Sequence, residues 1–528
     1  MALPLTGEIS LDDVNVELRL AEESTIAIGS TEVREFFEVE TGSISMSDGR
    51  GASNADGSWL STTNLFGGAN QRHNGWGAQN SAGDTLLATA WRERSFRGRG
   101  DDPSPNPYEG ISFISRDKDG AKLLQSAIDV SNVGSYREDC KGSIDDNRNI
   151  YLAYNDDSVS GQVALVVFKI NSSGVIQWQK SWPQHGLIND LTVTGSGDIY
   201  IAGARTSSNS VVSNRAQMTK INTNGTLQWV RVVSSAMNSL GETGWKIIVG
   251  PNGNIFMSTS HTNSGSNLFE FNSSGVMQGT GISFEDDEGI GIPFTIDSNG
   301  NIYALHYQPI SGVGTRGVVI KMNSSGVIQE SWVCQANERF AFYGDLAFNE
   351  TTGYLAIASQ ANYVPGLPYS HSAICFAELD MTTGTCNFSY NFRAQALNDE
   401  GDYRFDGRSE GVTLFNSEGG SYQISVPIQM NDWTGGEYQM QIDPNALPFN
   451  ATYGYVEAAE STGTIGQAPD QPMVSIAAAI DTWAAYTWSQ GSISRTATSV
   501  TLSSPTNQSF SIFALTVAVD HYYTTSAI

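Results

Sequence analysis

The chain has 528 residues, a formal net charge of −27 and a sequence pI of about 4.4. An acidic surface repels phosphate backbones and anionic headgroups, which argues against nucleic-acid or membrane-surface binding. No apolar run approaches a membrane span, and the first residues lack the basic and apolar parts of a signal peptide. Glycine is abundant at 54 residues, and Ser, Thr and Asn separate short apolar stretches, a pattern typical of an all-β chain.

Residues 1–56 carry a short motif three times, at 7–18, 25–37 and 42–48, and it predicts a small helical module. Ser10 or Asp12 can cap a first helix, and Ser30 or Thr31 a second. Helices this short need tertiary support, so we expect the module to dock on a larger body or to cap the first blade of the next domain. The apolar side chains expected to make the docking contact are Val14, Leu18, Val33, Phe36 and Phe37.

The sequence of residues 1–56 resembles the N-terminal sequences of tailed-bacteriophage virion proteins. The pattern Gly-x-Ile-Ser-Leu-x-Asp-Val-Asn-x-Glu-Leu at 7–18, followed by Gly-Ser-Ile-Ser-Met-Ser-Asp at 42–48, is similar to tail and fibre components of marine and cyanobacterial phages. The chain departs from it at Arg19, where the family more often has glycine, and at 49–51. The resemblance implies a virion structural protein, made in the host cytoplasm, whose opening module attaches it to other tail proteins.

After a predicted linker at 57–67, a sequence repeat of about fifty residues runs through 68–450. One half is a turn inside an apolar–polar alternation, seen at 168–178, 218–229, 269–278 and 320–329. Its turn glycines, Gly174, Gly225, Gly275 and Gly326, are 51, 50 and 51 residues apart. Weaker copies at 117–120, 381–384 and 443–445 bring the number to seven.

The other half of the repeat is a second hairpin, as at 191–202, 247–256 and 294–304. Asn-Gly and Ser-Gly supply the positive φ of tight turns, and the flanking alternation gives each strand one buried face. Two hairpins per period make four antiparallel strands, the content of one propeller blade. We therefore predict a seven-bladed β-propeller over 68–450, with a β-helix or an array of sandwiches as the alternative.

Residues 451–528 lose the period. Apolar segments at 473–483 and 509–519 flank an alternating stretch at 492–502, which predicts a small C-terminal β-domain or an oligomerisation face.

Motifs for catalysis or metal binding are sparse, so we expect no enzyme activity, no cofactor and no metal site. Six scattered histidines form no HxxxH or HxH pair, and no nucleophile elbow, Walker loop or dinucleotide fingerprint occurs in its required context. The acidic cluster Glu285, Asp286 and Asp287 can bind calcium, act on a glycan, or be a solvated loop. The turn at 297–301 mimics part of a calcium loop but fits a hairpin turn better. Cys375 and Cys386 flank a predicted hairpin, and either a disulfide or two thiols fits them.

Aromatic residues divide by their place in the period. Trp178, Trp229 and Trp332 follow the turn glycines at similar offsets, which predicts packing between blades. Aromatic residues outside the period are candidate sugar contacts, namely Trp76, Trp182, Tyr307, Tyr363, Tyr369 and Trp433. A basic island with four arginines at 92–99 reads as a long solvated loop or a contact for an acidic neighbour.

These features favour a tail or tail-fibre protein of a phage virion that attaches through 1–56 and presents its propeller to a host-surface glycan or a neighbouring protein. We expect homo-oligomers and no nucleic-acid or membrane partner. The alternatives are a glycan-degrading propeller enzyme, a capsid decoration protein and a cellular propeller scaffold.

Overall fold

The structure of the protein, a computed structural model, describes its strands and tight turns between residues 59 and 524. The described residues are 59–63, 71–93, 109–118, 122–129, 136–156, 163–182, 185–205, 215–233, 242–261, 265–284, 292–310, 314–334, 342–361, 373–394, 413–416, 422–430, 434–442, 452–453, 473–477, 483–485, 491–493, 497–499, 506–507, 512–513 and 521–524. The expected helical module and its docking residues Val14, Leu18, Val33, Phe36 and Phe37 lie outside them. Within them, no helix could span a membrane.

Twenty-four strands form the main part of six sheets, each of which contains four strands that follow one another in the chain. The first three sheets are β2(Gln71–Gln79), β3(Thr85–Glu93), β4(Glu109–Arg116), β5(Lys122–Asp129); β6(Tyr136–Ile144), β7(Ile150–Asp156), β8(Ala164–Ile170), β9(Ile176–Trp182); and β10(Leu187–Val193), β11(Ile199–Arg205), β12(Arg215–Ile221), β13(Leu227–Val233). The next three are β14(Glu242–Val249), β15(Ile255–His261), β16(Gly265–Phe271), β17(Met277–Phe284); β18(Phe294–Ile296), β19(Ile302–Ile310), β20(Gly314–Met322), β21(Ile328–Cys334); and β22(Phe342–Phe348), β23(Leu355–Ala361), β24(Ala373–Leu379), β25(Cys386–Ala394).

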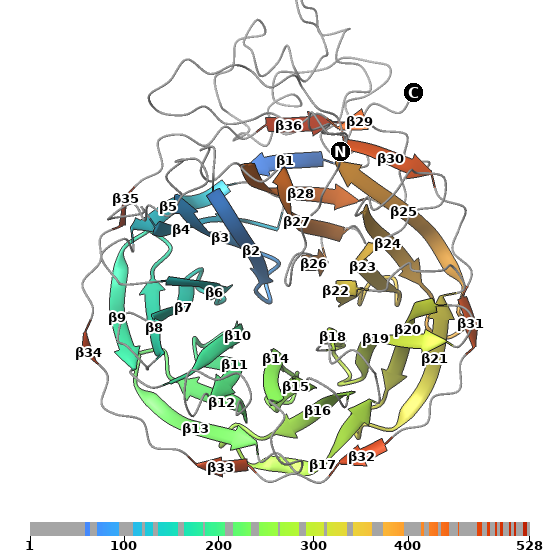
Figure 1. Ribbon diagram of the computed structural model, residues 1–528, viewed down its shortest axis with the longest axis horizontal. Helices are drawn as coiled ribbons and strands as arrows, with labels where there is room; N and C mark the ends of the chain where they lie inside the picture. The colour runs from blue at the N-terminus through green and yellow to red at the C-terminus, as the bar shows by residue number, and fades with distance from the viewer. Residues whose placement is uncertain are drawn as a thin grey trace, which may run out of the picture.

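These sheets stand radially around a common axis, which is the arrangement of a β-propeller (Figure 1). The first strand of each sheet is innermost and the fourth lies toward the rim. All pairings within the sheets are antiparallel, and the described part of the chain contains strands and turns but no helix. The predicted all-β propeller is therefore confirmed.

A seventh sheet is assembled from distant parts of the chain. It joins β26(Thr413–Asn416), β27(Tyr422–Met430) and β28(Thr434–Ile442) to β1(Trp59–Thr63), with Leu60 opposite Met440. The segment 57–67, expected to be a linker, thus contains a strand of this sheet. On the other side, Gln79 Nε2 of β2 donates to the carbonyl oxygen of Asn416 at 2.7 Å, which links the first sheet to the seventh.

The C-terminal strands differ from the separate β-domain that the sequence predicts. They are β29(Thr452–Tyr453), β30(Met473–Ala477), β31(Trp483–Ala485), β32(Gly491–Ile493), β33(Ala497–Ser499), β34(Thr506–Asn507), β35(Ile512–Phe513) and β36(His521–Thr524). From β30 on, each joins the rim of one of the seven sheets, and β29 extends β30 (Figure 1). Apart from the β29–β30 pair, the described C-terminal strands pair with strands of the seven sheets and not with one another.

The repeated turns fold as the glycine spacing predicts. In the turn at 171–175, Asn171 Oδ1 accepts hydrogen bonds from the backbone N–H of Ser173 (3.1 Å) and Val175 (2.8 Å), while Gly174 takes a φ of 79°. Asp297 does the same in a first turn, and its second oxygen accepts from Asn301 Nδ2 and Tyr303 Oη. These donors occupy the carboxylate, which supports the hairpin interpretation of 297–301 over a calcium loop.

The hydrophobic core lies between neighbouring sheets. One cluster joins Tyr303 and Val319 of the fifth sheet to Leu346 and Ile357 of the sixth. The periodic tryptophans belong to this packing as predicted, because each indole N–H reaches a turn of the next sheet. Trp178 donates to the carbonyl oxygen of Thr223 (3.0 Å), Trp229 to that of Ser273 (3.3 Å) and Trp332 to that of Met381 (2.9 Å).

Candidate functional site

The strand connections divide the propeller into two faces. In a sheet of four consecutive antiparallel strands, the first and third connections lie at one end of the strands. The second connection and the exit to the next sheet lie at the opposite end. The first and third connections are the tight turns, such as 145–149 and 171–175, and we call their side the turn face. The opposite side, where second strands end, third strands begin and fourth strands leave for the next sheet, we call the loop face.

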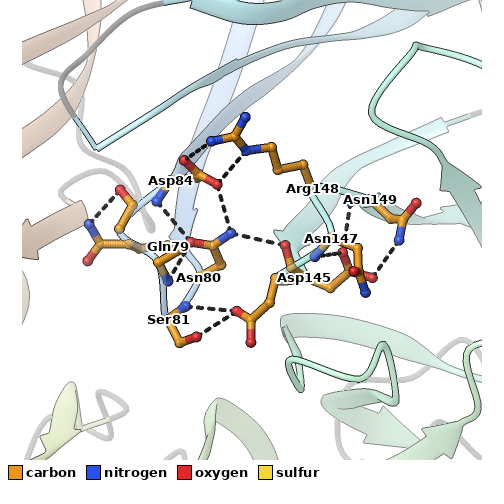
Figure 2. A network of polar contacts seen from close by, with 11 residues as sticks. Gln79, Asn80, Ser81, Asp84, Asp145, Asn147, Arg148 and Asn149 are labelled. Carbon is orange, nitrogen blue, oxygen red and sulfur yellow. Dashed lines mark hydrogen bonds and ion pairs between the residues drawn. The ribbon is translucent and has the colours of Figure 1, made fainter.

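Hydrogen bonds join neighbouring turns across the turn face (Figure 2). Asn80 Nδ2 of the first sheet donates to the carbonyl oxygen of Asp145 in the second at 3.0 Å. Arg148 returns the contact, with Nε 2.8 Å from Asp84 Oδ2 and Nη2 3.2 Å from Oδ1. The Asp84 carboxylate raises the pKa of Arg148 through this hydrogen bond. The Asp84 side chain is only 3% exposed, so the pair is a partly buried link between two sheets.

A second contact recurs in the same turns. Ser81 donates to Asp146 Oδ1 from its backbone N–H (3.1 Å) and its hydroxyl (2.7 Å). Four sheets further round, the Ser298 hydroxyl contacts Glu350 Oε2 at 2.8 Å, and its N–H donates to the same carboxylate. In each case a serine one residue into a turn meets an acid at the same place in the following sheet. Side chains of the turn face are thus engaged in holding sheets together.

Most of the binding residues that the sequence predicts lie in, or next in the chain to, strands that end or begin at the loop face. Tyr307 lies in β19, a second strand, toward the end that reaches this face. Glu285, Asp286 and Asp287 follow β17 directly, Tyr363 and Tyr369 lie between β23 and β24, and Trp433 lies between β27 and β28. The strands that flank these residues end or begin at the loop face, as do β3 and β4 on either side of residues 94–108. The side chain of Tyr307 and the whole of the other residues lie outside the described part, so their contacts stay predictions.

Two of the candidate aromatic residues are buried instead. Trp182 is the last residue of β9 and is 0% exposed, packed with Leu165, Val167 and Ile188 between the second and third sheets. Trp76 is 6% exposed in the core next to it. Trp182 is therefore a core residue, because the fourth strand of one sheet ends against the first strand of the next and its indole fills that space.

The innermost strands carry charges that the sequence analysis missed. Lys141, Asp190, Lys246 and Asp345 each lie four residues before the residue that starts the first turn of their sheet. Lys246 forms an ion pair with Asp345. Asp190 Oδ2 accepts from the backbone N–H of Ile247 at 2.8 Å, and Asp345 Oδ2 accepts from that of Leu414 at 3.1 Å. The common offset from the turns is the signal that could have found them.

These charges on the inner strands connect neighbouring sheets. Burial raises the pKa of Asp190 to about 6, and the N–H of Ile247 and the charges of Lys246 and Lys141 lower it in part. Asp190 and Asp345 each accept a hydrogen bond from a backbone N–H of the next sheet in the ring. These contacts tie the inner strands of neighbouring sheets to one another.

One buried histidine lies near the loop face, at the entry to β10. His185 is 1% exposed, and its Nε2 is 2.8 Å from Thr219 Oγ1. Gln217 Nε2 donates to the His185 carbonyl oxygen at 2.9 Å. Burial lowers the pKa of His185 to about 4, so the imidazole is neutral at pH 7. It has the surroundings of a satisfied core histidine.

The part of the chain that the structure describes brings no three His, Cys, Asp or Glu side chains together in a way that could hold a metal ion. Cys375 and Cys386 lie on the paired strands β24 and β25 but out of register, since Cys375 faces Asn391 and Cys386 faces Leu379. Cys386 is in no disulfide.

Comparison with known proteins gives a likeness of fold at most. No known family model matches the chain, and a search of characterised proteins finds no match. Among solved structures, hydrazine synthase of Kuenenia stuttgartiensis is 13% identical, with 55% of this chain and 76% of that chain covered and a TM-score of 0.35. A protein of unknown function from Dyadobacter fermentans is 9% identical, covering 73% of this chain and 98% of that chain, with a TM-score of 0.36. Bacillus subtilis levansucrase is 10% identical, covering 56% and 79%, with a TM-score of 0.26. At these values the likenesses support no inference about activity.

Proposed function

We propose that this chain is a structural, non-enzymatic binding protein of a phage virion, located in the tail or tail fibre. Residues 1–56 attach it to the particle, and the seven sheets form the blades of a closed ring that presents its loop face to a host-surface glycan or a neighbouring virion protein. The resemblance of residues 7–18 and 42–48 to tail-protein openings supports the attachment role.

The observation that carries the binding role is the difference between the two faces. Several polar side chains of the turn face are engaged between sheets, as Asn80, Ser81, Arg148 and Ser298 show. The strands that meet the loop face instead flank connections of unequal length, and the connection between β23 and β24 contains Tyr363 and Tyr369. Variable loops on a rigid scaffold are where binding residues concentrate. A tyrosine face against a sugar ring or a partner residue combines apolar area with a polar hydroxyl.

The first test is mass spectrometry of purified virions, with the copy number of this chain measured against the major capsid protein. A few to some tens of copies, on the order of the subunit number of closed symmetric rings and fibres, support a tail location. Hundreds of copies indicate a capsid decoration protein. Absence from the particle overturns the virion proposal and redirects the work to assays of glycan cleavage.

The second test separates the faces. The double variant Tyr363→Ala/Tyr369→Ala is expected to reduce adsorption to host cells or retention on a glycan array at unchanged melting temperature. The control on the turn face is Val276→Thr, since Val276 is 55% exposed and Thr226 occupies the same place in the preceding repeat. Equal binding by both variants would remove these tyrosines from the proposed site.

A further inference from the structure

The C-terminal segment runs round the outside of the whole propeller. Its strands meet the sheets in reverse chain order: β30 pairs with β25, β31 with β21, β32 with β17, β33 with β13, β34 with β9, β35 with β5 and β36 with β1. Every one of these pairings is antiparallel, and the strands lie at the rim in Figure 1. One stretch of chain thereby covers the outer edge of every sheet.

The spacing of these strands fits a segment laid around a ring. They begin at Met473, Trp483, Gly491, Ala497, Thr506, Ile512 and His521, so successive starts are six to ten residues apart. With strands about 4.8 Å apart, the fifth positions of neighbouring sheets in such a ring are separated by roughly 20 Å. Six extended residues reach about 20 Å, so even the shortest step suffices.

The composition of the segment also suits this place. Between residues 473 and 524 the charged residues other than His521 are Asp481, Arg495 and Asp520, in a chain that is 16% charged overall. An exposed sheet edge is a template for pairing with other chains, and proteins usually protect it by charge or by cover. Here the cover is a weakly charged strand of the same chain.

The last strand of the segment holds the first strand of the ring. β1 lies between β28 and β36, with Leu60 opposite Met440 on one side and opposite Tyr523 on the other. β1 starts at Trp59, directly after the residues expected to dock. Any pull on the N-terminal segment therefore reaches the propeller through β1 and its two neighbours.

We propose that residues 473–524 form a circumferential clasp that covers the outer edge of every sheet and, through β36, fastens β1 and the N-terminal segment to the ring. This inference is independent of the virion assignment, because it concerns how one chain closes its own fold. If this is correct, removing a backbone hydrogen-bond donor from one strand of the clasp should detach that strand from its sheet and leave the other strands in place.

The test of the fastening is Tyr523→Pro, which removes a backbone donor from β36, with Ser526→Pro beyond the strand as its matched control. Hydrogen exchange of residues 59–63, read by fragmentation mass spectrometry, is expected to speed up at least tenfold at alternate amides, because β1 bonds β28 and β36 with alternate residues. Amides facing β28 and those of β6–β8 should keep their rates. Unchanged exchange in β1, or equal effects of both variants, would overturn the fastening.

The proposal that the clasp covers the sheet edges is tested by Ser492→Pro in β32. Thr487→Pro, in the spacer before this strand, is the control. The strand variant should expose the edge of β17 and raise concentration-dependent self-association at least several-fold by light scattering, while the spacer variant stays monodisperse or keeps the parent's oligomeric state. A synthetic peptide of residues 487–497 added to the Ser492→Pro protein should reverse the association. If the association of Ser492→Pro equals that of the parent, β32 does not protect the edge.

Discussion

The most informative single substitution is Arg148→Gly, because two effects of known direction oppose each other there. Arg148 has a φ of 62°, at the turn position where four other sheets place Gly83, Gly197, Gly253 and Gly300 with φ between 79° and 88°. A left-handed conformation costs a residue with a Cβ about 1 kcal/mol relative to glycine. On backbone grounds alone, the glycine variant should be more stable.

The ion pair outweighs this gain. Arg148 makes two charged hydrogen bonds to Asp84, whose side chain is 3% exposed, while the arginine is 46% exposed. Charged hydrogen bonds contribute about 1.5–3 kcal/mol, and solvent screening at the arginine argues for the lower part, about 2 kcal/mol. Arg148→Gly should therefore lower the free energy of unfolding by about 1 kcal/mol, the difference of the two effects.

The same substitution should change sign when the carboxylate is absent. In an Asp84→Asn background the charged pair is gone, so Arg148→Gly should stabilise the protein by about 1 kcal/mol through the backbone alone. Urea unfolding of the four proteins, followed by tryptophan fluorescence at one ionic strength, gives the double-mutant cycle. If Arg148→Gly destabilises equally in both backgrounds, the ion pair is not the reason for an arginine in this turn.

Other predictions rest on single contacts. Gly253→Ala meets nothing within 4 Å and should cost about 1 kcal/mol for its φ of 79°, whereas Gly384→Ala places a Cβ against the Trp332 ring and should cost more than about 2 kcal/mol by the same unfolding assay. His185→Gln should flatten the acid limb of the stability curve: with the folded pKa lowered to about 4, the wild type loses about 3 kcal/mol as pH falls from 6.5 to 4, and the variant should not. Asp190→Asn should do the reverse, because a pKa raised to about 6 makes the wild type lose about 3 kcal/mol as pH rises from about 4 to 6. Parallel stability curves of wild type and variant between pH 4 and 7 would contradict either assignment.

The repeat made the sheets and their turns predictable from the sequence. Asn171, Gly174 and their equivalents determine the turns locally, through a side-chain oxygen and a positive φ, so a pattern of a few residues is sufficient. The contacts of Trp178 and Trp332 followed from the same register.

What sequence reasoning missed depends on long-range partners. The strands of 473–524 have two to five residues each and resemble a loose domain until their partners are known. Trp182 resembled a surface aromatic residue because it falls outside the period, although the next sheet covers it. Lys246 and Asp345 are 99 residues apart, so no local sequence pattern predicts their ion pair.

The split origin of the seventh sheet has a consequence for the order of folding. β1 ends at Thr63 and β28 begins at Thr434, so β1 must wait for a partner that is made much later. At roughly 5–20 residues per second, that wait is about 20–75 seconds. During synthesis the six sheets from β2 to β25 can form in turn from consecutive strands, whereas the contact of β1 spans most of the chain and closes late. A nascent chain stalled before Ile442 would thus hold the six four-stranded sheets in an open arc, with the pairing of β1 and β28 incomplete.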